Sequence, residues 1–455
     1  MDRCPSCPAI NRCIPADGPA YSDVLFIGDS PNKDDDRKGQ VFMGKAGDEL
    51  NRGYLPICNL RRENVIITNA IKCLPHGTGK LDPKKTGDLD MLRSCAETHL
   101  YKEIQQVRPK VLVPMGSFAC RAIDPNINLE LQHGMPVQTP HGIAFPMYHP
   151  AGGIHEPKKM LLIRTDWTRL NKYLKGRLNI PRDPFEGSEC YEHIDNPALV
   201  RSVLSGYDDM PMACDTESTR KRQPFCLTFS TEPGTGFLIR AEDEDSLAAF
   251  QAKVENWRGP ILFHNWLYDR DPVRLMGLRF RDKQIIDTMI MAFHLGNIPQ
   301  GLKAIAYRLL GMTMEDFDDV VTPHSKELVL EYYRQCMSEE WIKPEPELVR
   351  DPKGQWKVYK AQGFDTKLRR FFSDYTKNPD KDVFKMWEDN WENLHDQVQE
   401  RMGEWPGKCI SHTPFENVIT YACRDSDSTL RAYPLLKAMQ RQMRRKPQEH
   451  WLDAA

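Results

Sequence analysis

Residues 24–28 read Val-Leu-Phe-Ile-Gly, an apolar run that ends in a glycine and continues into the loop Asp-Ser-Pro. Such a run predicts a buried strand that opens into a tight turn. Residues 65–69 (Val-Ile-Ile-Thr-Asn) and 110–116 (Lys-Val-Leu-Val-Pro-Met-Gly) repeat this pattern, with helical stretches between them. Strands that alternate with helices indicate a parallel sheet covered by helices. The first part of the chain is therefore predicted to be an α/β domain.

Polar residues follow these strands directly. Asp29 follows the first strand, Asn69 ends the second and Gly116 ends the third. His149 follows a further short apolar stretch at 142–148. Because functional loops of parallel sheets gather at the carboxyl ends of the strands, we expect these loops to converge.

The length of 455 residues is too great for one hydrophobic core, so two or three domains are expected. We place the first domain at residues 1–180 and a proline-broken linker at 181–207. A second α/β domain comprises residues 208–317 and 413–455, and the segment 318–412 interrupts it.

The interrupting segment 318–412 is charged, shows no strand pattern and holds five of the nine tryptophans. Trp387 and Trp391 lie four residues apart, on one face of a helix. We interpret the segment as a helical insertion with a small core of its own; the alternative is a surface for DNA or a partner protein. Residues 284–312 and 415–440 are also expected to be helical.

Composition argues against a membrane or secreted protein. No apolar run approaches the roughly 18–20 residues that a membrane helix needs, and the N-terminus lacks a signal-peptide core. The net charge of −2 neither requires nor excludes nucleic acid, because a basic groove can lie in a neutral chain. We expect a protein of the bacterial or phage-infected host cytoplasm, with reduced cysteines.

Three motifs of the first domain resemble those of family 4 uracil-DNA glycosylases. Residues 28–32 (Gly-Asp-Ser-Pro-Asn) and 39–47 match the first motif, 68–73 match the second, and His149-Pro150 matches the third. The similarity continues through residues 158–170. The resemblance implies the fold of that family and the excision of uracil from DNA.

The resemblance also implies a role for each candidate residue. Asn69 can donate to uracil O4 and accept from N3–H, whereas cytosine presents the opposite pattern. Phe42 would stack on the base, and His149 would donate to O2, where negative charge develops. Asp29 would orient a water against the sugar carbon. Asp35 occupies the acid position that helps to exclude the methyl group of thymine.

The first motif departs from the family in ways that leave alternatives open. The family has glutamate at Asp29, alanine or glycine at Ser30 and glycine at Asn32. A shorter acid at Asp35 could leave room beside C5, so a 5-substituted or otherwise altered base is a second candidate. The changes at Asp29 and Asn32 also allow a different class of function. In that alternative the first domain is a non-catalytic uracil-DNA-binding module that tethers the second domain as a polymerase accessory subunit.

Cys4, Cys7, Cys73 and Cys95 match the four cluster ligands of the family. Four thiolates suit a [4Fe–4S] cluster, or a tetrahedral zinc ion, and the resemblance favours iron. Cys13 is a spare candidate for the place of Cys4 or Cys7. We expect a structural role for the cluster, since base excision needs no electron.

A second ordered set of motifs lies in the other domain. Asp215-Thr-Glu217 is placed on a strand, with both acids on one face, and Asp269 follows a buried strand. Tyr421 and Asp425 lie four residues apart in the last helix, on one face. Converging carboxylates imply divalent cations, here two Mg²⁺ or Mn²⁺ ions.

This order of motifs resembles DEDD-type 3′→5′ exonucleases with a tyrosine in the third motif, above all the proofreading domain of family A DNA polymerases. Asp287-Thr288 matches the pair between the motifs. The resemblance implies a ribonuclease-H-like fold. It assigns metal binding to Asp215, Glu217, Asp269 and Asp425, and orientation of the attacking water to Tyr421.

The two resemblances together predict a bifunctional DNA enzyme, in which excision of uracil is coupled to trimming of 3′ ends in replication or repair. The expected substrate is single- or double-stranded DNA. We see no polymerase palm motifs in the sequence, so a separate DNA polymerase is the expected partner, as in phage replication systems.

Overall fold

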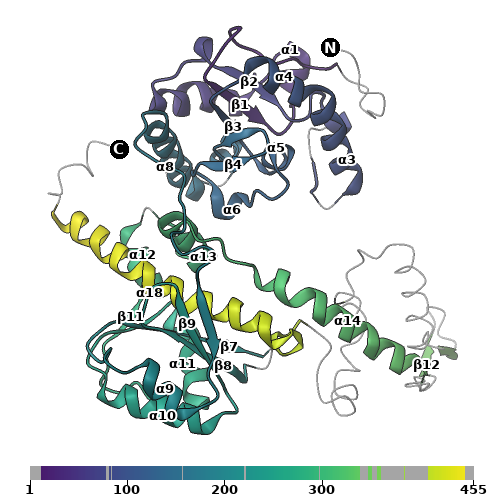
Figure 1. Ribbon diagram of the computed structural model, residues 1–455. Coiled ribbons are helices and arrows are strands. Elements are labelled where there is room, and N and C mark those ends of the chain that lie inside the picture. Colours follow the sequence, from purple (N-terminus) through teal and green to yellow (C-terminus); the bar gives the residue numbers. More distant parts are fainter. Residues whose placement is uncertain are drawn as a thin grey trace. The chain divides into compact units, whose positions relative to one another are not determined.

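The computed structural model divides into two compact units (Figure 1). Unit 1 comprises Met1–Pro184, Met291–Thr313 and Ala438–Ala455, and unit 2 comprises Phe185–Ile290 and Met314–Lys437. Unit 1 thus includes two segments that the sequence analysis placed in the second domain. The structure describes residues 12–77, 81–83, 85–155, 157–219, 222–296, 298–338, 347–350, 356–359, 384 and 408–445.

Unit 1 is built on a five-stranded sheet of order β2-β1-β3-β5-β4. β1 (Val24–Gly28) pairs in parallel with β2 (Ile66–Asn69) on one side and β3 (Val111–Pro114) on the other. β5 (Gly142–Ala144) is parallel to β3, and β4 (Val137–Thr139) is antiparallel to β5 at the edge. The predicted parallel arrangement is confirmed for the strands that carry the motifs. β4 was not predicted, because three residues give too short a pattern.

Both faces of this sheet are covered. Alternate residues of β1 enter different cores: Phe26 belongs to one hydrophobic cluster and Ile27 to the other. Trp167 stacks on Phe26 with ring centroids 5.4 Å apart. The helices of unit 1 are α1 (Lys33–Lys38), α2 (Lys45–Glu49), α3 (Thr86–Cys95), α4 (Tyr101–Val107), α5 (Ser117–Ile123), α6 (Leu129–Gln132), α7 (Pro150–His155), α8 (Pro157–Leu174) and α13 (Leu302–Ile305).

Unit 2 contains a six-stranded mixed sheet of order β11-β10-β7-β8-β9-β6. β7 (Met212–Ser218), β8 (Pro224–Ser230) and β9 (Thr235–Arg240) form an antiparallel meander. β10 (Ile261–Phe263) and β11 (Ile285–Asp287) extend the sheet in parallel on the other side of β7. A meander followed by parallel strands is consistent with the predicted ribonuclease-H-like class.

Helices complete unit 2. α18 (Phe415–Arg445), predicted at 415–440, is confirmed and carries the third acidic motif. The other helices of this part of the chain are α9 (Pro197–Val203), α10 (Glu244–Asn256), α11 (Trp266–Leu275), α12 (Thr288–Leu295), which crosses the boundary between the units, and α14 (Phe317–Ser338).

Three sequence expectations differ from the structure. The segment expected to be a linker contains β6 (Cys190–His193), which pairs in parallel with β9, and helix α9. Residues 285–287, expected to be helical, form β11, because their apolar run is too short to separate strand from helix. The segment 318–412 begins with α14 but also holds an antiparallel pair, β12 (Glu347–Arg350) and β13 (Trp356–Tyr359). The expectation that it contained no strand was therefore wrong.

In the part of the chain that the structure describes, no helix is both long enough and apolar enough to cross a membrane.

A buried polar network ties the segment 291–313 to the rest of unit 1. Arg308 donates from Nη2 to the carbonyl of His133 (2.6 Å), and His133 Nδ1 bonds Asp166 Oδ2 (2.7 Å). The ring of Tyr148 lies 4.7 Å from that of His133, centroid to centroid. Burial and the charge of the neighbouring Arg169 lower the pKa of Arg308 to about 10. Since Tyr148 directly precedes His149, this network supports the loop that carries the predicted histidine.

Replacing Arg308 by methionine keeps an apolar side chain but removes the donor to the His133 carbonyl. We expect the opening free energy of backbone amides in residues 129–149 to fall by about 1–3 kcal/mol, because a buried acceptor loses its partner. Hydrogen exchange measures this loss, with the amides of β7–β9 as the internal reference and Arg308→Lys as the charge-retaining control. Equal exchange in the wild type and the methionine variant would contradict the role assigned to Arg308.

Candidate functional sites

The first candidate site lies where β1 and β2 end. Gly28 and Asn69 are register partners at the carboxyl ends of these strands. A Cβ atom on Gly28 would lie 2.3 Å from Asn69 Oδ1 and 2.7 Å from two ring carbons of Phe42. The missing side chain of Gly28 is therefore what allows the amide and the aromatic ring to approach the same point.

The side-chain amide of Asn69 is buried and unpaired. The residue is 1 % exposed, and neither Nδ2 nor Oδ1 has a hydrogen-bond partner among the described residues. Buried polar groups are almost always bonded, because an unmade hydrogen bond costs about 1–3 kcal/mol. This donor and acceptor, side by side, are available to a ligand with a complementary edge.

Phe42 is held in place by its loop. It adopts a left-handed backbone conformation (φ 57°), which is unfavourable for a bulky residue. Asp35 Oδ1 accepts from Met43 N (2.6 Å), and Asp35 Oδ2 accepts from Asn32 N (3.1 Å). A Cβ atom on Gly47 would lie 1.8 Å from the Phe42 carbonyl oxygen. The loop thus depends on one buried carboxylate and one glycine.

The structure assigns Asp35 and Asn32 to this support. Asp35 is 3 % exposed, and both of its carboxylate oxygens bond the backbone. The side chain of Asn32 caps α1 by accepting from the backbone of Asp34 and Asp35, which accounts for an asparagine where the family has glycine. The contact predicted between Asp35 and the C5 position of a base stays a prediction.

His149 is a neutral donor in this structure. Its ring centroid lies 5.6 Å from that of Phe42. Ala151 N donates to His149 Nδ1 (3.2 Å), so the proton of the neutral ring is on Nε2. Burial lowers the pKa of His149 to about 4. At neutral pH the imidazole therefore offers an uncharged N–H group.

Asp29 lies in the loop after β1, against the start of α5. Its Oδ1 accepts from Ala119 N (2.7 Å), and a Cβ atom on Gly116 would lie 2.3 Å from its Oδ2. Burial raises the pKa of Asp29 from 3.8 to about 7, although the amides of Ala119 and Phe118 oppose the shift. A carboxylate with this pKa is suited to accept a proton from water near neutral pH.

The predicted cluster ligands are only partly described. Cys4 and Cys7 lie outside the described residues. Cys73 and Cys95 are both buried, and Cys95 Sγ accepts from a backbone N–H group (3.1 Å). Cys13 lies within hydrogen-bonding distance of Cys73, thiol to thiol. The neighbouring thiols of Cys13 and Cys73 are of the type that ligates a metal cluster.

A buried ion pair that the sequence analysis missed lies beside these cysteines. Lys72 Nζ donates to Glu103 Oε2 (2.5 Å) and to Thr68 Oγ1 (2.5 Å). Burial lowers the pKa of Lys72, and the negative charge of Glu103 opposes that shift. Lys72 lies within the second motif, between Asn69 and Cys73, so the sequence indicated its importance. Nothing in the sequence identified Glu103 as its partner.

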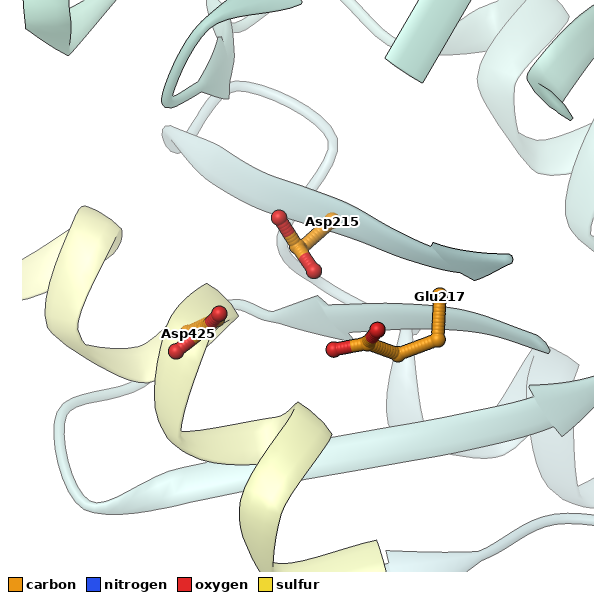
Figure 2. A group of neighbouring side chains, drawn as sticks. All are labelled: Asp215, Glu217 and Asp425. Carbon is orange, nitrogen blue, oxygen red and sulfur yellow. The ribbon is translucent and has the colours of Figure 1, made fainter. Parts of the chain in front are cut away.

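The second candidate site is a group of carboxylates in unit 2. Figure 2 shows Asp215 and Glu217 of β7 and Asp425 of α18 pointing toward one another. Ligand oxygens of the three residues all lie within 4.8 Å of one another. Burial raises the pKa of Asp215 well above its usual range, and the charges of Asp269, Asp425 and Glu217 raise it further. The arrangement is suited to divalent cations, which would offset this repulsion.

Asp269, the fourth predicted ligand, stands beside this group and not in it. Its Oδ1 accepts from the backbone N (3.0 Å) and from Oγ1 (2.7 Å) of Thr216. Its Oδ2 is buried without a partner in the described part of the chain. Burial raises the pKa of Asp269 to about 7. The unpaired oxygen is the atom through which Asp269 could reach a cation.

Tyr421 lines the cavity around these acids, which measures about 500 Å³. Burial and the charges of Glu217 and Asp425 raise the pKa of its phenol. The hydroxyl therefore stays protonated at neutral pH and can act as a hydrogen-bond donor.

Two further acids, Asp287 and Asp427, hold neighbouring elements of the site through hydrogen bonds. Asp287 accepts from the backbone N of Asn265 (3.1 Å) and of Trp266 (2.9 Å), which fixes the start of the helix that carries Asp269. Asp427 accepts from Gly234 N (2.8 Å) and from the Tyr191 hydroxyl (3.0 Å). The sequence analysis placed Asp287 in a motif but did not reveal the partners of either residue.

The first unit matches a known family. Residues 15–175 match the uracil DNA glycosylase superfamily. The type-4 uracil-DNA glycosylases of Saccharolobus solfataricus and Thermotoga maritima are 27% and 26% identical to this chain over 175 and 157 residues. These matches cover 36% and 33% of this chain and 78% of each relative. The N-terminal part of the chain therefore carries a domain of this superfamily, as the motifs predicted.

Solved structures also show similarity. The catalytic core of RRP6 from Trypanosoma brucei matches with a TM-score of 0.29 and 13% identity, over 60% of this chain and 55% of that chain. NrnC from Brucella melitensis with bound Mg²⁺ matches with a TM-score of 0.21 and 13% identity, over 57% of this chain and 96% of that chain. The chain thus spans little more than half of the RRP6 core. At these TM-scores, the interpretation of unit 2 depends on its own geometry.

Proposed function

We propose that unit 1 excises uracil, or a closely related altered base, from DNA. The observation that carries the proposal is the buried amide of Asn69 at the end of β2, which no described residue bonds. Uracil presents an acceptor at O4 beside a donor at N3, which matches this amide, whereas cytosine presents the reverse. A base can reach so buried a group only after it leaves the helical stack.

The other residues of the pocket fit the steps of excision. Phe42 would stack on the extruded base. The Nε2–H group of His149 can donate to O2, where negative charge grows as the glycosidic bond breaks. Asp29 can hold a water and take its proton as the water attacks the sugar carbon. The role of His149 needs the neutral ring that burial favours, and the role of Asp29 needs the carboxylate that forms above its pKa of about 7.

We propose that the N-terminal cysteines hold a [4Fe–4S] cluster of structural function. The ligands would be Cys73 and Cys95 with Cys4 and Cys7, and Cys13 stands close enough to Cys73 to replace one of the last two. When bound, the cluster would join the N-terminal segment to the end of α3.

We propose that unit 2 is a metal-dependent 3′→5′ exonuclease acting on DNA, in the service of a separate DNA polymerase. The group of Asp215, Glu217 and Asp425 carries this proposal. Two divalent ions bound there would supply an activated water and neutralise the leaving 3′-oxygen. Tyr421 would donate a hydrogen bond that orients this water, and Asp269 would complete the ligand set.

The histidine and the asparagine should affect uracil release differently. Loss of the His149 donor should lower single-turnover release about 10²–10³-fold while binding of uracil-containing DNA persists, because the contact is strongest in the transition state. Asn69→Ala should weaken binding as well as the discrimination against cytosine. The measurement is free base released from a uracil-containing oligonucleotide. If the wild type binds this DNA but releases no deaminated base, unit 1 is a binding module.

The rate of release should depend on pH through Asp29. The folded-state pKa of about 7 lies above the usual value of 3.8, so below pH 7 the carboxyl is protonated and cannot accept a proton. The rate should rise about tenfold per pH unit up to pH 7 and then level off. His149, with a pKa of about 4, should add no step above pH 5. Asp29→Asn should be slow and insensitive to pH; a flat profile in the wild type would contradict the role of Asp29 as base.

The exonuclease should require added metal. Mononucleotides should be released from 3′-labelled single-stranded DNA in Mg²⁺ or Mn²⁺, and not in EDTA. A variant with Asp215→Asn and Glu217→Gln should lose this activity yet stay folded, because removing buried like charges relieves repulsion. Uracil release by the same variant is the matched control. Digestion that persists in EDTA, or in the double variant, would overturn the metal assignment.

A further inference from the structure

A buried triangle of hydrogen bonds lies behind the strand end that carries Asn69. Lys72 Nζ donates to Thr68 Oγ1 (2.5 Å) and to Glu103 Oε2 (2.5 Å), and Thr68 Oγ1 donates to the same Glu103 oxygen (2.9 Å). Thr68 and Lys72 are fully buried, and Glu103, which comes from α4, is 8 % exposed. Because solvent does not reach these side chains, the bonds of the triangle are costly to break.

The triangle and the amide of Asn69 lie on opposite faces of β2. Successive residues of a strand point to opposite sides of the sheet. Thr68 points toward Glu103 of α4, so Asn69 points the other way. On that other face, Phe42 belongs to the same hydrophobic cluster as Ile67 of β2. The triangle can therefore act on a base beside Phe42 only through the backbone of the strand end.

The triangle joins the two ends of the segment 68–72, and backbone hydrogen bonds fix the middle of this segment. Ala70 N donates to Gly28 O (2.8 Å), and Ile71 N donates to Asp29 O (3.0 Å). None of these bonds uses the side-chain amide at position 69, whose two polar atoms have no partner among the described residues. An amide that stays available to a base in this way is oriented by the backbone that carries it.

The orientation of this amide decides which base it reads. With Nδ2 toward O4 and Oδ1 toward N3–H, the amide of Asn69 matches uracil. Rotated by half a turn, the same amide presents the reverse pattern and matches cytosine. A strand end that is free to shift would permit both orientations, whereas a fixed strand end can select one.

We propose that Thr68, Lys72 and Glu103 are positioning residues that hold Asn69 in the orientation that favours uracil over cytosine. This inference rests on the proposed glycosylase function and adds residues that set its specificity. The triangle contacts neither the base nor the sugar and acts through Asn69.

The test measures how strongly the full chain prefers uracil over cytosine in binding. Each oligonucleotide carries one 2′-fluorinated uridine or cytidine, whose glycosidic bond resists cleavage. Thr68→Val keeps the shape of the side chain and the pair of Lys72 with Glu103, but it removes the link to β2. This variant should lower the preference about 2- to 10-fold, the effect of one hydrogen bond, and Thr68→Ser should restore it because serine keeps the hydroxyl.

A control variant separates this effect from a general loss of stability. Thr139→Val removes another buried hydroxyl of unit 1, which donates to Gly142 O (2.7 Å) in the hairpin of β4 and β5. It should leave the preference unchanged. Partial unfolding lowers the binding of both oligonucleotides alike, so it does not change their ratio either.

Two further variants test whether the triangle acts through Asn69. The double variant Lys72→Met with Glu103→Gln removes the donor without leaving a lone buried carboxylate, and it should also lower the preference. In the Asn69→Ala background, Thr68→Val should cause no further loss, because the residue through which it acts is gone. Losses that add up in the combined variant would overturn the assignment.

Hydrogen exchange gives a readout that needs no base. The amides of Ala70 and Ile71 should exchange faster in Thr68→Val than in the wild type or in Thr139→Val. If the wild type prefers uracil and Thr68→Val keeps that preference in full, the inference fails and the proposed function stands. If the wild type shows no preference, the proposed function fails and the role in base reading fails with it.

Discussion

The amide of Asn69 is buried at the end of β2 without a partner among the described residues. Several features of unit 1 keep space open beside this amide. The parallel pairing of β1 and β2 brings Gly28 opposite Asn69, and the missing Cβ leaves space at that point. Asp35 bonds the backbone N–H groups of Met43 and Asn32 and so supports the loop that carries Phe42. The free energy lost at the amide is available to a base that restores its hydrogen bonds.

Unit 2 shows the same principle with charge in place of an amide. Carboxylates on β7 and α18 face one another, and burial with mutual repulsion raises the pKa of Asp215. A neutral amide without its ligand costs the fold about 1–3 kcal/mol of free energy in unmade hydrogen bonds. Grouped carboxylates must instead take up protons or bind cations. The backbone N–H and hydroxyl of Thr216 satisfy one oxygen of Asp269, and the other has no partner among the described residues. The carboxylate oxygens are thus already grouped for cation binding without a substrate.

The sequence predicted the residues whose chemistry shows in their identity and spacing. Apolar runs predicted β1, β2 and β3, and ordered acids predicted the meeting of Asp215, Glu217 and Asp425. It did not predict the supports, because these depend on pairs that are distant in the chain, such as Lys72 with Glu103 or Asp427 with Gly234. It missed β11 and the β12–β13 pair because strands of three or four residues leave too little pattern to identify.

Each unit is made of segments that are not contiguous in the chain. Unit 1 includes Met291–Thr313, which lies in the chain between motifs of unit 2, and from it Arg308 reaches the carbonyl of His133. His133 in turn holds Asp166 and packs against Tyr148, the residue before His149. A fragment that ended at Pro184 would keep every motif of the glycosylase family yet lack this donor. The loop of the predicted catalytic histidine therefore depends on chain that no glycosylase motif identifies.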